Sequence, residues 1–291
     1  MAPHHNNELG ATVSGFRLPI SRCQLPGFVL GFRQLMLNIA VISHKGGSGK
    51  TALAANLAGA FAAAGSSVLA VDVDPQGGLT AALGVEPGKP TLYEVINSLA
   101  RPEEAARRTA VPGITLLPAD FDLAGAELEL PLRGRWHDAL RRAISRYAAL
   151  HDVTILDTPP GLGVLSFAAL SAADAAVIAC PPEFMAYRAL TQVLRTAHRT
   201  GVTVLGIVPT LSHRTTRLAA EVLDQLYKDY PQLVLPAIPR RVAVQEAALA
   251  GLPLAVYAPR SDAGLAFATL AKEVTHRVQS SDAKRPARAR G

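Results

Sequence analysis

The sequence predicts an α/β fold, a doubly wound and mostly parallel sheet with helices on both faces. Short apolar runs bounded by Gly, Pro and Asp alternate with longer Ala- and Leu-rich stretches, as strands and helices do when they follow one another. The first apolar run, the Ala-rich stretch and the next apolar run occupy about 35 residues. That is the size of a βαβ unit, whose strands are parallel and whose crossover is right-handed. No internal repeat interrupts this order, so one such domain is expected.

Each element follows from local composition. Residues 37–43 are apolar and stop before a run of glycines, so they predict the first strand. Residues 50–64 predict a helix because Ala is the best helix former. Gly-Ser-Ser at 65–67 ends that helix, and residues 68–73 form the second strand. The later elements are a helix within 91–100, a strand at 114–118, a helix at 135–150, strands at 153–157 and 175–180, a helix at 187–200, a strand at 202–208, a helix at 215–230, a short strand at 233–235, and helices at 242–250 and 264–278.

Between the first strand and the first helix, residues 44–51 read His-Lys-Gly-Gly-Ser-Gly-Lys-Thr. This is a deviant P-loop (Walker A): the ordinary pattern is G-x-x-x-x-G-K-[ST], but His44 replaces the first glycine and Lys45 adds a second lysine. Its glycines let backbone N–H groups form a nest for phosphate, and the helix N-terminus adds partial positive charge. Lys50 should reach the β- and γ-phosphates, and the Thr51 hydroxyl should bind Mg²⁺. Read alone, Lys45 could equally be an exposed surface lysine.

Three aspartates stand at the ends of apolar runs. Asp72 and Asp74 precede a Gln-Gly-Gly turn at the edge where doubly wound sheets bind ligands. Alternation along a strand puts both on one face, where one could position an attacking water; in isolation, the pair could instead cap a turn. Asp157 ends the run at 153–157, which is the Walker B pattern whose carboxylate holds Mg²⁺, often through a water. The metal candidates are therefore Thr51, Asp157 and Asp72.

The motifs at 45–51, 72–77 and 157–160, with Ile238-Pro239-Arg240, resemble those of the ParA/MinD family of deviant Walker ATPases. The likeness runs from residue 37 to about 279 and is greatest to the short, Soj-like partition proteins for chromosomes and plasmids. It implies an ATP-sandwich homodimer in which Lys45 crosses to the partner's nucleotide, as an arginine finger does. It also implies that Asp74 supports slow, Mg²⁺-dependent hydrolysis, stimulated by a ParB-like centromere-binding partner.

The site candidates combine the motifs with this resemblance. The family usually carries a second Thr after the P-loop Thr, and here Ala52 stands there, so one small polar contact is missing. The catalytic candidates are Lys45, Lys50 and Asp74, and the nucleotide-binding candidates are Lys45, Gly46, Gly47, Ser48, Gly49, Lys50, Thr51, Ala52 and Pro239.

Arginines gather in the C-terminal half. No acidic residue occurs from Phe184 to Ala220, whereas five arginines do. If the helices share a face, this is a basic patch that binds DNA phosphates without sequence preference, and dimerisation doubles it. The resemblance also implies nonspecific DNA binding by this region, although Thr215 stands where a DNA-contacting Arg would align. The alternative is a solvated arginine-rich surface. The DNA-binding candidates are Arg188, Arg214, Arg217, Arg240 and Arg241.

Composition limits the remaining classes. The 291 residues are 49% hydrophobic with a net charge of +6, and no apolar run is long enough for a membrane span. The tail also lacks the bulky apolar residues of a membrane-binding helix, and two cysteines suit a reducing compartment. A cytoplasmic, nucleoid-associated protein without membrane contact is expected. Residues 1–36 are predicted to be a poorly ordered extension, 37–280 the ATPase domain and 281–291 a basic flexible tail.

The sequence thus predicts an ATP-dependent DNA-partition ATPase, whose ATP dimer binds DNA until a partner stimulates hydrolysis. Two alternatives stay open. One is a ParA-like positioning ATPase for another cargo, such as a microcompartment or chemoreceptor cluster. The other is a metabolic ATP-dependent ligase.

Overall fold

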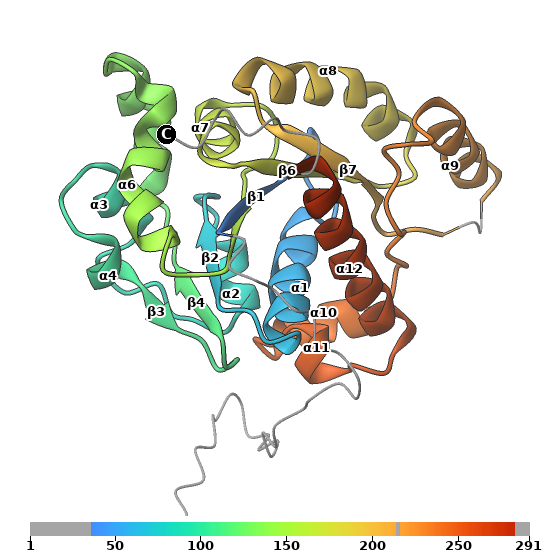
Figure 1. Ribbon diagram of the computed structural model, residues 1–291, viewed down its shortest axis with the longest axis horizontal. Helices are drawn as coiled ribbons and strands as arrows, with labels where there is room; N and C mark the ends of the chain where they lie inside the picture. Colours follow the sequence, from blue (N-terminus) through green and yellow to red (C-terminus); the bar gives the residue numbers. More distant parts are fainter. Residues whose placement is uncertain (1–35, 214–215, 283–291) are drawn as a thin grey trace, which may run out of the picture.

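The computed structural model describes residues 36–213 and 216–282. They form a seven-stranded sheet in the order β3-β4-β2-β5-β1-β6-β7, with helices on both faces (Figure 1). All neighbouring strands are parallel except the edge strand β3, which runs antiparallel to β4. The predicted fold class is confirmed.

The bounds of the strands are β1 Leu37–Ile42, β2 Val68–Asp72, β3 Arg107–Arg108, β4 Ile114–Leu117, β5 Val153–Asp157, β6 Ala175–Cys180 and β7 Thr203–Pro209. The α-helices are α1 Lys50–Ala63, α2 Gly78–Ala82, α3 Leu92–Ile96, α4 Pro102–Ala105, α5 Leu123–Glu129, α6 Ala139–Ala148, α7 Val164–Ala172, α8 Phe184–Thr200, α9 Arg217–Asp229, α10 Val242–Leu249, α11 Leu254–Tyr257 and α12 Asp262–Asp282; η1 Leu130–Leu132 and η2 Trp136–Asp138 are 3-10 turns.

The sheet is buried on both faces, which explains the continuous apolar runs of its strands. Along β1, Ile39 and Val41 pack with α1 and α12 on one face. Ala40 and Ile42 face the other side and pack with α6, α7 and α8. Because both sides are covered, the carboxyl-end edge of the parallel strands is left for ligands.

The elements differ from the sequence prediction in a few places. Residues 233–235 are not a strand: Val234 makes a single parallel bridge to Ile207 of β7. The chain passes so close there that a Cβ on Gly206 would lie 2.4 Å from the Leu233 carbonyl oxygen. Helix α7 was not predicted, because it is buried nearly all round and therefore lacks an amphipathic period. The short helices α2, α4, α5 and α11 were also missed.

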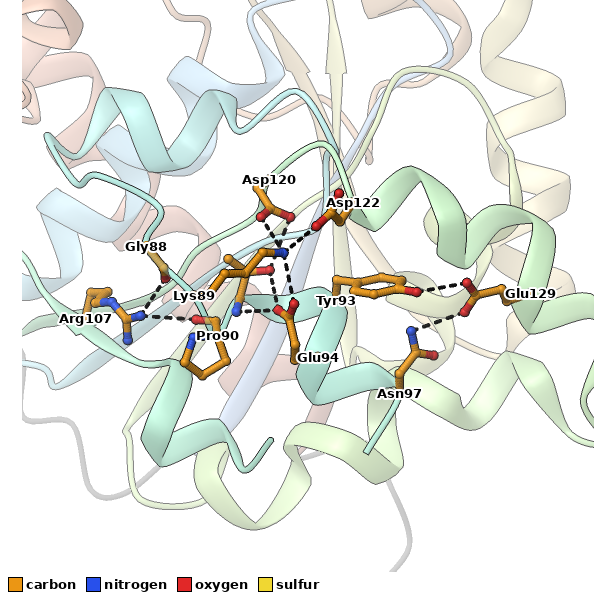
Figure 2. Close-up of polar contacts among 11 residues, drawn as sticks. Gly88, Lys89, Pro90, Tyr93, Glu94, Asn97, Arg107, Asp120, Asp122 and Glu129 are labelled. Atoms are coloured by element: carbon orange, nitrogen blue, oxygen red, sulfur yellow. Dashed lines mark hydrogen bonds and ion pairs between the residues drawn. The ribbon is translucent and has the colours of Figure 1, made fainter. Parts of the chain in front are cut away.

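A charged cluster joins the loop before α3 to the connection between β4 and α5 (Figure 2). The Lys89 ammonium lies 2.9 Å from Glu94, 2.7 Å from Asp120 and 2.6 Å from Asp122. One lysine thus holds together a carboxylate of α3 and two carboxylates of the β4–α5 connection.

Two expectations lie outside the described residues. The predicted N-terminal extension lies outside them except for residue 36, because residues 1–35 are not described. The predicted basic tail lies outside them except for residues 281–282, which end α12. No helix in the described ranges has the length and apolar character needed to cross a membrane.

Candidate nucleotide-binding site

The loop between β1 and α1 has the backbone of a phosphate cradle. Gly47 and Gly49 adopt left-handed conformations, with φ of 71° and 77°, which glycine reaches without strain. Gly49 is also the N-cap of α1, so the first turn of that helix opens towards the cradle. Behind the loop, the Thr210 hydroxyl donates to the Ser48 carbonyl at 2.6 Å. The loop is therefore held from β7 as well as by its own ends.

A cavity of about 890 Å³ opens over this loop at the carboxyl edge of the sheet. Its walls come from the P-loop and the start of α1, from the turn after β2, from residues that follow β5, β6 and β7, from α10 with the segment leading into it, and from α12. The lining residues are Gly46, Gly47, Ser48, Gly49, Lys50, Thr51, Ala52, Leu53, Asp74, Pro160, Glu183, Thr210, Leu211, Ile238, Pro239, Arg240, Arg241, Val242, Val244, Gln245 and Phe267. The structure thus gathers every nucleotide-binding candidate except Lys45.

Lys50 and Asp157 form a buried charge pair beside the cavity. The Lys50 ammonium lies 3.8 Å from Asp157 Oδ1, and both side chains are almost fully buried. Neither carboxylate oxygen of Asp157 has a hydrogen-bond partner among the described residues. Burial raises the pKa of Asp157, and the charge of Lys50 opposes that rise. A buried carboxylate whose oxygens accept no hydrogen bond from the described part of the chain, next to Thr51 at the start of α1, fits a hydrated Mg²⁺, which prefers oxygen ligands and keeps several waters.

Asp72 and Asp74 have different surroundings. The Asp72 carboxylate is fully buried and accepts hydrogen bonds from the Thr80 amide at 2.8 Å, the Thr80 hydroxyl at 2.7 Å and the Asp74 amide at 3.2 Å. Asp74 lines the cavity, and its Oδ1 accepts a hydrogen bond from the Gln76 amide at 3.0 Å. Strand β2 ends at Asp72, so the alternation that would place both on one face stops there.

These contacts change one assignment. Neither Asp72 nor Asp157 lines the cavity, but the oxygens of Asp72 are used by Thr80 and Asp74, whereas those of Asp157 have no hydrogen-bond partner among the described residues. We therefore propose that Asp72 holds the turn and keep Thr51 and Asp157 as metal candidates. Burial, followed by the nearby Asp157 carboxylate, raises the pKa of Asp72. No group of three or more His, Cys, Asp or Glu in the described ranges could hold a metal by itself.

Lys45 does not line the nucleotide cavity of its own chain. Its ammonium forms an ion pair with Glu183, which does line the cavity, and both side chains are about half exposed. Glu183 was not singled out from the sequence. Its position directly after β6, at the edge where ligands bind, was the available signal. Thr210 after β7 could have been found in the same way.

The predicted DNA-contacting arginines fall into two groups. Arg188 on α8 packs over the Phe184 ring at 5.6 Å, and Arg217 at the start of α9 pairs with Glu221 at 2.7 Å. Arg240 and Arg241 instead line the cavity, and Arg241 pairs with Asp262 at 2.5 Å. Figure 1 shows α8 and α9 together, apart from α10. Arg214 lies outside the described residues.

Comparison with known proteins places this site in a family. A family model described as an AAA domain matches residues 36–204. The chain is 37% identical to the chromosome partitioning protein ParA of Caulobacter vibrioides, covering 84% of this chain and 96% of that protein. It is 36% identical to the chromosome-partitioning ATPase Soj of Thermus thermophilus, covering 86% and 99%.

Solved structures agree with this placement. McdA from Cyanothece, without nucleotide, superposes with a TM-score of 0.75 at 26% identity, covering 82% of this chain and 99% of McdA. A cobyrinic acid a,c-diamide synthase from Mycobacterium smegmatis, solved with an ATP analogue and magnesium, superposes with a TM-score of 0.73 at 34% identity, covering 84% and 96%. The chain therefore belongs to the ParA/MinD family of P-loop ATPases, and over most of its length it is similar to ParA and Soj partition proteins.

Proposed function

We propose that the chain binds Mg-ATP in the 890 Å³ cavity and that two copies dimerise around two nucleotides. The observation that supports this most is the separation of the two P-loop lysines. Lys50 is buried against Asp157 beside the cavity, whereas Lys45 is half exposed at the rim and does not line the cavity. A lysine presented by the loop but not used by its own cavity is available to the nucleotide of a second copy.

Each lining residue has a chemical role in this proposal. The loop N–H groups and Lys50 bind the phosphates, and Asp74 orients the attacking water. Thr51 and Asp157 would hold Mg²⁺, which when bound neutralises charge on the β- and γ-phosphates. Lys45 of one protomer offsets the charge that develops on its partner's nucleotide.

We further propose that the ATP dimer binds double-stranded DNA nonspecifically and that a ParB-like partner stimulates hydrolysis and so releases it. Relatives named as chromosome-partitioning proteins support this cycle. Exposed arginines on α8 and α9 are suited to phosphate contacts. A protein with this cycle would be located in the cytoplasm, in association with the nucleoid.

The test is DNA binding by fluorescence anisotropy on two duplexes of unrelated sequence, with ATP and Mg²⁺, with ADP and Mg²⁺, without nucleotide, and with ATP and EDTA. Binding should require ATP with Mg²⁺ and should be equal for both duplexes. Binding that is independent of nucleotide, or that occurs with one duplex only, contradicts the proposal.

A second candidate is the positioning of another cargo by the same cycle, which the similarity to McdA favours. DNA binding does not separate the two candidates, because both use it. Stimulation of ATP hydrolysis by a centromere-binding protein supports partition. Stimulation by a cargo-linked protein instead supports positioning. The similarity to the cobyrinic acid a,c-diamide synthase keeps a ligase as a testable alternative, whose signature is rapid ATP turnover that requires a small carboxylate substrate.

A further inference from the structure

The Lys45–Glu183 ion pair joins the two loops nearest the cavity mouth. Lys45 follows β1 and Glu183 follows β6, and these strands are parallel neighbours paired through Ile42 and Ile178. Their carboxyl ends therefore lie side by side, and the two loops that leave them meet. The side chains are 48% and 46% exposed, so the pair is accessible to a second copy.

The carboxylate of Glu183 is directed to Lys45 and not to the first turn of α8. Glu183 is the N-cap residue of α8, yet its side chain makes no capping hydrogen bond there. The Lys45 backbone is also held, since its carbonyl accepts from the Ser43 hydroxyl at 2.9 Å. The loop thus fixes the backbone position of Lys45, and the ion pair with Glu183 fixes the position of its ammonium group.

We propose that Glu183 is a positioning residue that holds Lys45 within its own chain until dimerisation, as an intrachain latch. This inference rests on the proposed ATP dimer in which Lys45 acts in trans. A triphosphate carries more charge and more acceptor oxygens than one carboxylate, so it draws Lys45 off Glu183. A diphosphate lacks the γ-phosphate, and after hydrolysis Lys45 returns to Glu183. The latch opposes dimers formed without ATP and favours separation after hydrolysis.

The size of the latch's effect on dimerisation follows from the exposure of the Lys45–Glu183 ion pair. An ion pair that is half exposed changes an equilibrium constant by up to about fivefold. Forming the dimer opens two latches, so releasing both should strengthen dimerisation by up to about 25-fold.

The first experiment detects the pair directly. A carbodiimide joins lysines to carboxylates in direct contact, and mass spectrometry identifies the linked peptides in the full chain. A Lys45–Glu183 link should form without nucleotide and with ADP, and should fall several-fold with a non-hydrolysable ATP analogue and Mg²⁺. Links from Lys89 to its three carboxylates provide an internal control, because nucleotide should not change them (Figure 2).

The second experiment measures the latch as an equilibrium. Glu183→Gln keeps the shape of the side chain and removes its charge. By analytical ultracentrifugation with the ATP analogue, the dimer dissociation constant should fall by about twofold to 25-fold. The matched control is Glu104→Gln, which removes an exposed pair with Arg101 at the same 46% exposure and should leave dimerisation unchanged. Thermal denaturation of each variant separates a loss of folding from a change in dimerisation.

Three results overturn the latch. They are the absence of the 45–183 link in the nucleotide-free protein, an unchanged dimer constant in Glu183→Gln, and a weaker dimer in that variant, which would make Glu183 part of the dimer contact. If neither wild type nor variant dimerises although the link forms, the proposed function itself fails and the pair is a surface contact only.

Discussion

Asp74 offers a sharp test of the site, because it has two separable tasks. Its Oδ1 accepts a hydrogen bond from the Gln76 amide at 3.0 Å, which shapes the turn, and the residue also lines the nucleotide cavity. Asp74→Asn keeps an acceptor for the turn and removes the charge. Asp74→Ala removes both.

The two effects differ in size. A hydrogen bond of this kind contributes about 1 kcal/mol to stability, so Ala should lower the free energy of unfolding by that amount and Asn by less. A residue that positions or deprotonates the attacking water contributes roughly 10²–10⁴ in rate, about 3–5 kcal/mol of barrier. Because the cost to folding is small beside this, both variants should fold, bind ATP and accumulate as dimers that do not hydrolyse it.

The assay is single-turnover hydrolysis of labelled ATP, with the dimer followed by size-exclusion chromatography and stability by urea denaturation. Both variants should show the same large loss of rate, although only Ala shows the full loss of stability. If Asp74→Asn hydrolyses ATP at the wild-type rate, Asp74 is a turn cap and another group positions the water.

Three further predictions use the same protein. Lys45→Ala should prevent ATP-dependent dimerisation in size-exclusion measurements while the monomer binds nucleotide nearly as before; a normal dimer would rule out the role in trans. Arg217→Glu should weaken DNA retention equally for all sequences and flatten its salt dependence. The control Arg101→Glu, which disrupts a similar exposed ion pair, should leave DNA retention unchanged. Equal losses of DNA retention in both variants would show that net charge alone is responsible. Burial raises the pKa of both Asp72 and Asp157 above the unfolded value, so their contribution to the stability of the nucleotide-free protein is most favourable below about pH 4 and is lost as pH rises towards about 7. Urea denaturation across this range should show a shallower decline in Asp72→Asn, and an unchanged pH profile would contradict the assigned cause.

Local patterns were enough for the fold class and for the phosphate cradle. Alternating strand and helix signals specify a βαβ order, and the glycines at 47 and 49 adopt the left-handed conformations that a nest requires. Asp157 at the end of β5 was likewise readable from its place after an apolar run. Helix α7 and the stretch at 233–235 were not, because tertiary burial and a close backbone approach determine them.

The sequence alone thus determined most of the strands and the longer amphipathic helices, and which residues stand at the carboxyl ends of the strands, since these depend on local composition and period. Only the tertiary structure decided how those ends meet. In the folded chain, Asp72 accepts hydrogen bonds from Thr80, whereas Asp74 lines the cavity. Lys45 pairs with Glu183, which is 138 residues away in the chain. Such contacts depend on strand order, because β1 and β6 become neighbours only when the sheet is assembled.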